Sequence, residues 1–276
     1  MKLKYLGTAA AEGWPALFCQ CESCKRARAL GGKNIRTRSQ AIIDDRLLID
    51  FCPDTYMHIL QHHLPMENIH HMLITHSHID HLYASDLINL AEPYAHGVTE
   101  PMTIYSTPGT GEKMALVLKA EDDSDNLSER LIFKEVKEFV PFKVLDYIVT
   151  PLLAKHMVNE KCYIYLIEDK NGRTLLYGND TAWFPEQTWI YLKGHHLDAV
   201  SLDCTVVFDP DCLTHMGFAS DVKTKEKLIA MGCADKNTTF ILTHFSHNGR
   251  ASHEEIEERA AKEGFLTSYD GFETEI

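Results

Sequence analysis

Short apolar segments recur along the whole chain, and polar segments separate them. Most are as long as a β-strand, and their content of β-branched and aromatic residues favours strands over helices. The predicted strands are KLKYLG near the start and residues 41–51, 71–75, 102–106, 131–136, 143–150, 162–168, 174–178, 198–204 and 239–243.

Between the strands lie segments with the length and the end signals of helices. Ser220 and Ser252 are candidate N-cap residues, and Glu255 lies three residues after Ser252, which is the spacing of a capping box. The first predicted strands follow one another almost directly, whereas later strands alternate with helices. This order predicts sheets covered by helices on the outside, an α/β sandwich rather than a barrel. The predicted helices span roughly residues 80–92, 109–119, 185–193, 220–231 and 252–263.

The composition is that of a globular protein with an acidic surface. The chain has 276 residues, of which 45% are hydrophobic, and it shows no repeat or flexible linker, so we expect one domain over residues 1–276. No apolar run reaches the roughly 18 to 20 residues that cross a bilayer, and MKLKYLGTAA lacks the apolar stretch of a signal peptide. We therefore expect a cytoplasmic protein without a membrane partner. The net charge of −13 repels polyanions, so nucleic acid is not an expected partner.

The segment THSHIDHLYASD, residues 75–86, holds three histidines and two aspartates in twelve positions. It lies between a predicted strand and a predicted helix, where functional side chains concentrate. In extended backbone His76 and His78 project to the same side, and Asp80 and His81 can turn inward from the first helical turn. The segment therefore predicts ligands for two adjacent metal ions.

A second candidate metal site lies near the N-terminus. Cys19, Cys21 and Cys24 form a Cys-x-Cys-x-x-Cys array, and the other five cysteines are scattered, which does not indicate disulfide pairing. Three thiolates can share a tetrahedral zinc ion that needs a fourth ligand. His247 in the segment THFSH is the candidate. We expect a closed, structural Zn²⁺ held by these four residues.

The THSHIDH segment resembles the signature of the metallo-β-lactamase superfamily, whose fold is an αββα sandwich with one or two metal ions at the strand ends. The resemblance implies three further ligands downstream, and His156, Asp180 and His244 match them, each just past a predicted strand. Imidazole and carboxylate ligands suit Zn²⁺, Mn²⁺ or Fe²⁺, and we expect two divalent ions, Mn²⁺ or Zn²⁺. By the resemblance, one ion is held by His76, His78 and His156 and the other by Asp80, His81 and His244, with Asp180 between them.

Further motifs resemble one branch of this superfamily. The opening GTAAAEGWPALFCQCESCKRAR, the GND turn, the LDC strand end, THFSH and the terminal DGFE are similar to the family of the phosphonate-pathway phosphoribosyl 1,2-cyclic phosphate phosphodiesterase. The resemblance implies a two-metal hydrolase that opens a small cyclic phosphodiester such as phosphoribosyl 1,2-cyclic phosphate. It implies Asp80 and His215 as catalytic residues, with His215 donating a proton to the departing alkoxide. The regions 111–142 and 205–214, which would border the pocket, depart from the family pattern.

Several alternatives share this ligand set. A β-lactamase is usually secreted, and we expect no signal peptide here. An RNA-processing nuclease needs a basic surface, whereas the net charge is −13. A relative in quinone-cofactor biosynthesis carries a similar cysteine loop. A glyoxalase-like thioesterase and a non-catalytic metal-binding relative are also open, as is a homodimeric assembly. Under the favoured reading the partner is a small phosphorylated substrate. Candidates for holding a second phosphate are Arg36, Arg38, Lys155 and Arg250.

Overall fold

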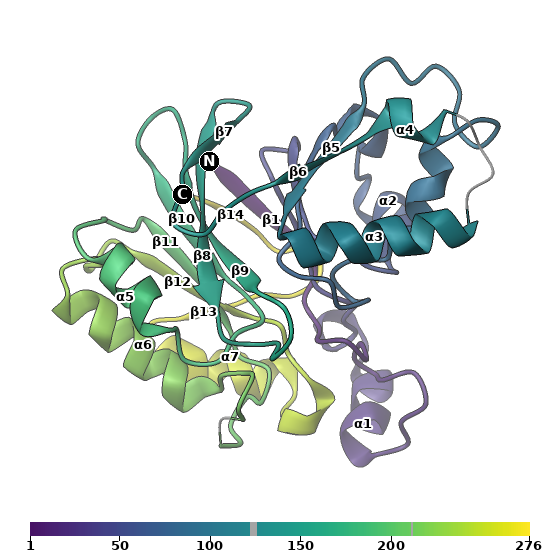
Figure 1. The fold of residues 1–276 in the computed structure, drawn as a ribbon. Coiled ribbons are helices and arrows are strands. Elements are labelled where there is room, and N and C mark those ends of the chain that lie inside the picture. Colours follow the sequence, from purple (N-terminus) through teal and green to yellow (C-terminus); the bar gives the residue numbers. More distant parts are fainter. Residues whose placement is uncertain (122–125, 211) are drawn as a thin grey trace.

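The chain folds into two β-sheets that lie face to face, with helices on both outer faces (Figure 1). We describe a computed structural model, which covers residues 1–121, 126–210 and 212–276. The first sheet has the strand order β14-β1-β2-β3-β4-β5-β6 and the second β13-β12-β11-β10-β9-β8-β7. The first sheet comprises β14 (Glu273–Glu275), β1 (Lys2–Gly7), β2 (Gln40–Ile43), β3 (Leu47–Ile49), β4 (His71–Leu73), β5 (Met102–Ser106) and β6 (Leu131–Glu135). The second comprises β13 (Leu266–Thr267), β12 (Thr239–Thr243), β11 (Ala199–Asp203), β10 (Thr174–Gly178), β9 (Cys162–Glu168), β8 (Tyr147–Ala154) and β7 (Phe142–Val144).

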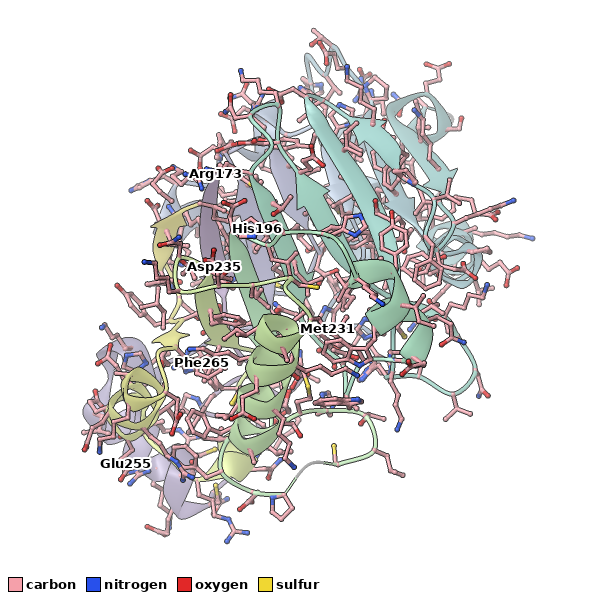
Figure 2. The ribbon with its side chains drawn as sticks, turned by 90° about the vertical axis from the view of Figure 1, so that its left-hand side faces the viewer. Arg173, His196, Met231, Asp235, Glu255 and Phe265 are labelled. Atoms are coloured by element: carbon pink, nitrogen blue, oxygen red, sulfur yellow. The ribbon has the colours of Figure 1, made fainter. Side chains whose placement is uncertain are left out.

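The helices cover the outer faces of the two sheets, so the expected αββα sandwich is confirmed. Figure 2 shows α6 lying across the strands of the second sheet, with Met231 just past its C-terminal end. The second sheet is covered by α5 (Glu186–Leu192), α6 (Phe218–Ala230) and α7 (His253–Lys262), and α1 (Glu22–Leu30) lies near α7. The first sheet is covered by α2 (Thr55–His62), the 3₁₀ helix η3 (Ala84–Leu90), α3 (Pro108–Glu121) and α4 (Leu127–Arg130). Shorter 3₁₀ helices are η1 (Gly32–Asn34), η2 (Met66–Asn68) and η4 (His247–Gly249).

Three layers of buried apolar side chains hold the sandwich together. One fills the space between the sheets, and Tyr5 and Ile43 belong to it. Leu6 and Ile42, one position along the same strands, belong to the layer between the first sheet and its helices. Successive side chains of a strand point to opposite faces, so a strand buried on both faces is apolar throughout. This is why the predicted strands read as continuous apolar runs.

Two predicted strands are each a pair of strands joined by a tight turn. The stretch 41–51 forms β2 and β3, which pair antiparallel, and Asp44 and Asp45 in their turn have φ of 50° and 55°. The stretch 143–150 is divided between β7 and β8, with Leu145 at φ 56° in the turn. Aspartate tolerates this left-handed conformation better than most residues, which makes the Asp-Asp pair a turn signal.

The helices agree with the predicted ranges at four places and differ at one. The helix predicted over 80–92 is shorter in the structure: residues 79–81 form a turn, and only Ala84–Leu90 are helical, as the 3₁₀ helix η3. The capping box of Ser252 and Glu255 is confirmed at the start of α7. Ser220 is not an N-cap, because α6 begins two residues earlier after Gly217. Among the described residues, no helix combines the length and the apolar character that crossing a bilayer requires.

Candidate metal centre

The carboxyl ends of several strands meet at one edge of the sandwich and deliver polar side chains there. Strands β3 and β4 are parallel neighbours in the first sheet, as are β10, β11 and β12 in the second. Parallel neighbours end at the same edge, so the residues that follow them are close in space. The residues that follow these strands and β8 include Asp50, the His76–His81 loop, His156, Asp180 and His244.

Three imidazole rings converge on one point of this edge. Nδ1 of His78 lies 2.9 Å from Nε2 of His76 and 2.9 Å from Nε2 of His156. The carboxylate of Asp180 completes the group, with its Oδ2 3.2 Å from Nε2 of His76. The four ligand atoms lie within 4.8 Å of one another. Three imidazoles and one carboxylate can together hold one divalent ion.

A second group shares Asp180 with the first. Nε2 of His81 lies 3.2 Å from Oδ2 of Asp80 and 3.1 Å from Oδ2 of Asp180. Nε2 of His244 lies 3.3 Å from Nε2 of His81. All four side chains are buried. The sequence-predicted ligands are thus brought together in two adjacent groups with Asp180 in both.

The unsatisfied atoms of the site fit bound cations. Oδ1 of Asp180 is buried and has no hydrogen-bond partner among the described residues, although Nδ1 of His156 and Nδ1 of His215 lie 3.0 and 3.1 Å away. A buried carboxylate oxygen without a hydrogen bond is costly unless a positive charge lies beside it. Asp180 also has φ 56°, a backbone conformation that few residues other than glycine adopt. The donor set and the buried oxygen without a hydrogen bond therefore both suit divalent ions.

The protonation states of three candidate ligands, His76, Asp80 and Asp180, also suit metal binding. Burial lowers the pKa of His76 to about 3, so its ring is neutral and keeps a lone pair. Burial opposes ionisation of Asp80 and Asp180, but the neighbouring histidines outweigh it and hold the pKa of both carboxyls below the usual range. Each of these groups is in the deprotonated form that a metal ligand needs.

Two buried residues behind the ligands were not predicted. Oδ2 of Asp50 lies 2.7 Å from Nδ1 of His81, while Oδ1 of Asp50 accepts a hydrogen bond from the backbone N–H of Thr75. Oγ1 of Thr205 lies 2.8 Å from Nδ1 of His244. Such contacts hold the Nδ1 side of each ring, so the Nε2 atoms are directed at the metal position. Asp50 directly follows the apolar run LLI, and this strand-end position is the signal that could have identified it.

His215 lies at the side of the same site, against two carboxylates. Its Nδ1 is 3.0 Å from Oδ2 of Asp203 and 3.1 Å from Oδ1 of Asp180. Burial disfavours the charged ring, but Asp203 and Asp180 outweigh it and raise the pKa of His215 to about 11. Asp203, the aspartate of LDC, is fully buried and accepts backbone hydrogen bonds from Thr181 and Thr205. His215 is therefore held with Nδ1 on the carboxylates.

Two of the basic residues considered for phosphate binding are engaged elsewhere. Arg36 is only 3% exposed and donates to Oγ1 of Thr8 and to the carbonyl of Ser268. Arg38 forms an ion pair with Asp54 at 2.8 Å. These contacts give both arginines a structural role, which argues against Arg36 and Arg38 as phosphate ligands.

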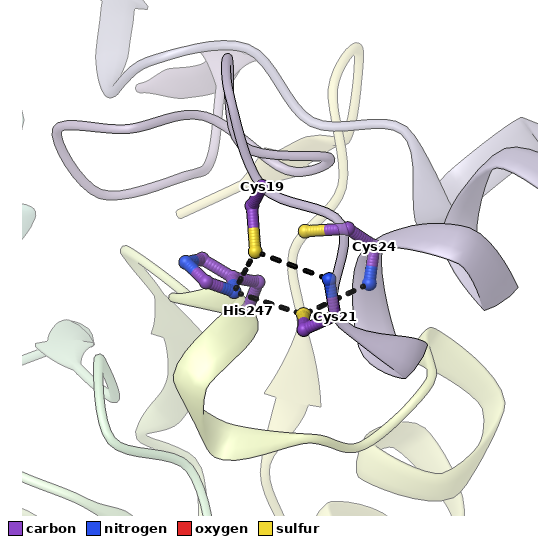
Figure 3. A group of neighbouring side chains, drawn as sticks. All are labelled: Cys19, Cys21, Cys24 and His247. Atoms are coloured by element: carbon purple, nitrogen blue, oxygen red, sulfur yellow. Dashed lines mark hydrogen bonds between the residues drawn. The ribbon is translucent and has the colours of Figure 1, made fainter.

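The cysteine array and His247 also come together (Figure 3). Nδ1 of His247 lies 3.8 Å from Sγ of Cys19 and 3.5 Å from Sγ of Cys21. A tetrahedral zinc with Zn–S of about 2.3 Å and Zn–N of about 2.0 Å has S···N edges of roughly 3.6 Å. The backbone N–H of Cys24 donates to Sγ of Cys21 and, as the largest effect, lowers the pKa of that thiol to about 6. The geometry and the acidic thiol both fit a Cys₃His zinc site.

His247 has an acidic partner on its other side. Its Nε2 lies 3.5 Å from Oε1 of Glu12, opposite the nitrogen that faces the thiols. A carboxylate in this position is a common second partner of a zinc-bound imidazole. His247 also lies three residues after His244, so the segment after β12 belongs to both candidate metal sites.

The fold and the site together define a class of protein: a metal-dependent hydrolase with a metallo-β-lactamase αββα sandwich. The family model described as beta-lactamase superfamily domain matches residues 45–245. This match covers more than half of the chain, and the chain belongs to that superfamily. No curated protein matches the sequence.

Solved structures of this fold cover the chain from end to end. A diphosphatase from the PhnP family has a TM-score of 0.77 at 22% identity, covering 100% of this chain and 97% of its own. The Zn²⁺-bound PqqB of Methylobacterium extorquens has a TM-score of 0.69 at 19% identity, covering 100% of both chains. The short form of human tRNase Z has a TM-score of 0.62 at 16% identity, covering 100% of this chain and 99% of its own. At these identities the similarity shows the fold.

Proposed function

We propose that this protein is a dinuclear metal-dependent phosphodiesterase that opens a small cyclic phosphodiester, such as phosphoribosyl 1,2-cyclic phosphate. The ligands would be His76, His78 and His156 for one ion and Asp80, His81 and His244 for the other, with Asp180 between them. The native ions would be Mn²⁺ or Zn²⁺, and the substrate a small phosphorylated molecule.

The observation that carries the proposal is the position of His215. Its ring lies 4.9 Å from that of His156, centroid to centroid, and its Nδ1 contacts the shared carboxylate of Asp180. A proton donor beside the metal positions is what the departure of an alkoxide requires. The similarity to a diphosphatase of the PhnP family supports phosphorus chemistry.

The bound ions, Asp203 and His215 would have different roles in the reaction. Two bound divalent ions would supply positive charge for the phosphoryl oxygens and a more acidic water molecule. Asp203 orients His215 through Nδ1, which leaves Nε2 to donate a proton to the leaving oxygen. Because cations beside Asp180 would offset part of its negative charge, they would lower the pKa of His215 towards neutrality, where the ring can both give and regain a proton.

The Cys₃His group would hold one structural Zn²⁺ and take no part in the reaction. With four protein ligands it offers no open position for a substrate. Bound there, zinc would fix the segment from Cys19 to Cys24 beside η4 and hold the β12 end in which His244 lies.

The test is a substrate panel with matched variants. Purified protein with Mn²⁺ or Zn²⁺ is assayed on bis(p-nitrophenyl) phosphate, ribose 1,2-cyclic phosphates, a glutathione thioester, a β-lactam and a tRNA precursor. We expect turnover of the phosphodiesters, lost in His76→Ala and retained in His70→Ala, a histidine directly before β4 that belongs to neither group. Absence of phosphodiester turnover in metal-loaded protein would overturn the proposal.

The same panel separates the alternative functions. Cleavage of the tRNA precursor alone would make the chain an RNA-processing nuclease, as human tRNase Z is named, although the charge of −13 opposes RNA binding. Cleavage of the thioester alone would indicate a glyoxalase-like enzyme. No turnover with bound metal would indicate a non-catalytic relative.

A further inference from the structure

A carboxylate outside the two metal groups connects the loops that carry them. Glu160 accepts hydrogen bonds from three side-chain hydroxyls, those of Ser77, Thr107 and Thr110. Oε1 of Glu160 lies 2.9 Å from Oγ1 of Thr110 and 3.2 Å from Oγ1 of Thr107, and Oε2 accepts from Ser77. Both of its oxygens are therefore engaged, and neither bonds a residue of its own loop.

Ser77 and Glu160 lie in the two loops that carry candidate metal ligands. Ser77 lies between the candidate ligands His76 and His78, and Glu160 lies four residues after the candidate ligand His156. The Ser77–Glu160 hydrogen bond thus joins the loop after β4 to the loop after β8. These loops belong to different sheets, and Nδ1 of His78 must meet Nε2 of His156 at 2.9 Å.

Two of the hydroxyls lie at the start of α3, Thr107 directly before the helix and Thr110 in its first turn. Thr107 and Thr110 are almost fully buried, and the backbone N–H of Thr110 donates to Oγ1 of Thr107 at 3.1 Å. A carboxylate at a helix N-terminus is stabilised by the helix dipole, and α3 runs for 14 residues. A Cβ on Gly109 would come within 3.1 Å of Cγ of Glu160, so this turn approaches Glu160 closely.

Helix α3 also holds the ligand loop directly. Lys113, one turn further along, donates to the backbone carbonyl of Ser77. Ser77 is therefore fixed at its carbonyl by Lys113 and at its hydroxyl by Glu160. A strand-end loop without such contacts would be free to move. Because these contacts already order His78 and His156, ion binding costs less conformational entropy.

We propose that Glu160 is a positioning residue that sets the distance between His78 and His156 and so determines the affinity of the ion held by His76, His78 and His156. The inference rests on the ligand assignment of the proposed function. Contacts of this kind typically change metal affinity 10- to 100-fold when they are removed. The ion held by Asp80, His81 and His244 has its own supports in Asp50 and Thr205 and does not depend on Glu160.

The experiment measures metal affinity, not turnover. Wild type, Glu160→Ala, Glu160→Gln, Ser77→Ala and the double variant are stripped of metal and titrated with Co²⁺ against a competing chelator, and bound metal per chain is measured. Glu135→Gln is the control, because Glu135 is exposed and lines the same groove of about 460 Å³ as Glu160. Thermal unfolding of each metal-free protein is followed in parallel.

We expect Glu160→Ala to weaken one of the two active-site ions by about 10-fold or more, with the other within about twofold of wild type. Ser77→Ala should weaken the same ion, and the double variant should be no weaker than Glu160→Ala because both changes break the same connection. Glu160→Gln, which keeps an acceptor oxygen, should recover part of the affinity. If the wild type binds no ion pair, the ligand assignment fails and not the role of Glu160.

Three results would overturn the proposal. Glu160→Ala could bind both ions as wild type does, or weaken both equally while lowering the melting temperature, which would be a general structural effect. The effects of Ser77→Ala and Glu160→Ala could also be additive, which would show that the two residues act separately. Should Glu160→Ala not fold, Glu160→Gln and Ser77→Ala test the same connection.

Discussion

Replacing Asp50 with asparagine should selectively weaken the ion at the Asp80–His81–His244 group. Asp50 is fully buried, with Oδ1 facing the backbone N–H of Thr75 at 2.8 Å and Oδ2 facing Nδ1 of His81 at 2.7 Å. The hydroxyl of Thr75 lies 2.9 Å from Oδ1 and 3.2 Å from Oδ2. An asparagine has one acceptor oxygen and one NH₂ group. If the oxygen stays on Thr75, the NH₂ group faces the N–H of His81, and the hydrogen bond is lost.

The size of the effect follows from this lost contact. A hydrogen bond to a charged group contributes about 1.5–3 kcal/mol, and about 1.4 kcal/mol corresponds to a tenfold change in an equilibrium constant. If His81 instead moves its proton to Nε2, it keeps a hydrogen bond to the amide but loses the lone pair that faces the metal position. Either response lowers the affinity of this ion by about 10- to 100-fold.

The assay is chelator competition with metal analysis on wild type, Asp50→Asn and Asp45→Asn. Asparagine tolerates the left-handed backbone, so the φ of 66° at Asp50 is not a source of strain in the variant. Asp45→Asn is the matched control, since Asp45 has φ 55° and pairs with Lys2 on the surface. Equal affinities for both ions in Asp50→Asn and wild type would refute this account of how His81 is oriented.

Three further predictions concern catalysis, the zinc site and pH. His215→Asn should lower kcat on a phosphodiester by about 10²- to 10⁴-fold at unchanged metal content, and a wild-type kcat would show that His215 donates no proton. Cys21→Ser should lose one tightly bound zinc per chain and lower the melting temperature, as metal analysis and calorimetry would show; a full zinc content would contradict the Cys₃His site. Burial lowers the pKa of His58 from 6.5 to about 3, so the neutral ring stabilises the fold fully above pH 6.5 and stability falls towards pH 3 by about 1.4 kcal/mol per pH unit. Denaturant unfolding of His58→Gln should show a shallower fall over this range, and an unchanged slope would be evidence against a neutral buried ring.

The positions of most strands along the chain and the candidate ligand histidines could be predicted from local patterns, because both depend on neighbouring residues. A strand buried on both faces is an apolar run, and the residues just after such runs lie at a sheet edge. His156, Asp180 and His244 were identified in this way together with the family pattern. Helices α1 and α2 were missed, because ESCKRARAL is mostly polar and TYMHILQH shows only a short apolar stripe.

The supporting residues could not be predicted in the same way, because their partners are far away in the sequence. Asp50 contacts a ring 31 residues later, and Glu160 contacts hydroxyls 50 to 83 residues earlier. A carboxylate in a polar loop is usually solvated, so only the tertiary structure distinguishes Glu160 from Asn159 beside it. Residues that support candidate metal ligands from a distance in the sequence, such as Asp50 and Glu160, can therefore be identified only from the tertiary structure.

The backbone of the site gives an independent reason to regard it as functional. Asp50, Asp180 and His244 each follow a strand and have φ of 66°, 56° and 62°. Residues other than glycine adopt this region uncommonly, even though aspartate, asparagine and histidine tolerate it better than most, so surrounding contacts must hold it. Here the contacts are those of the candidate metal centre, since each residue turns its side chain from the strand end towards His76 or His81. If this conformation exists only to aim these side chains, Asp180→Gly should fold at least as stably as wild type while losing metal, whereas a purely structural turn would lose stability and metal together.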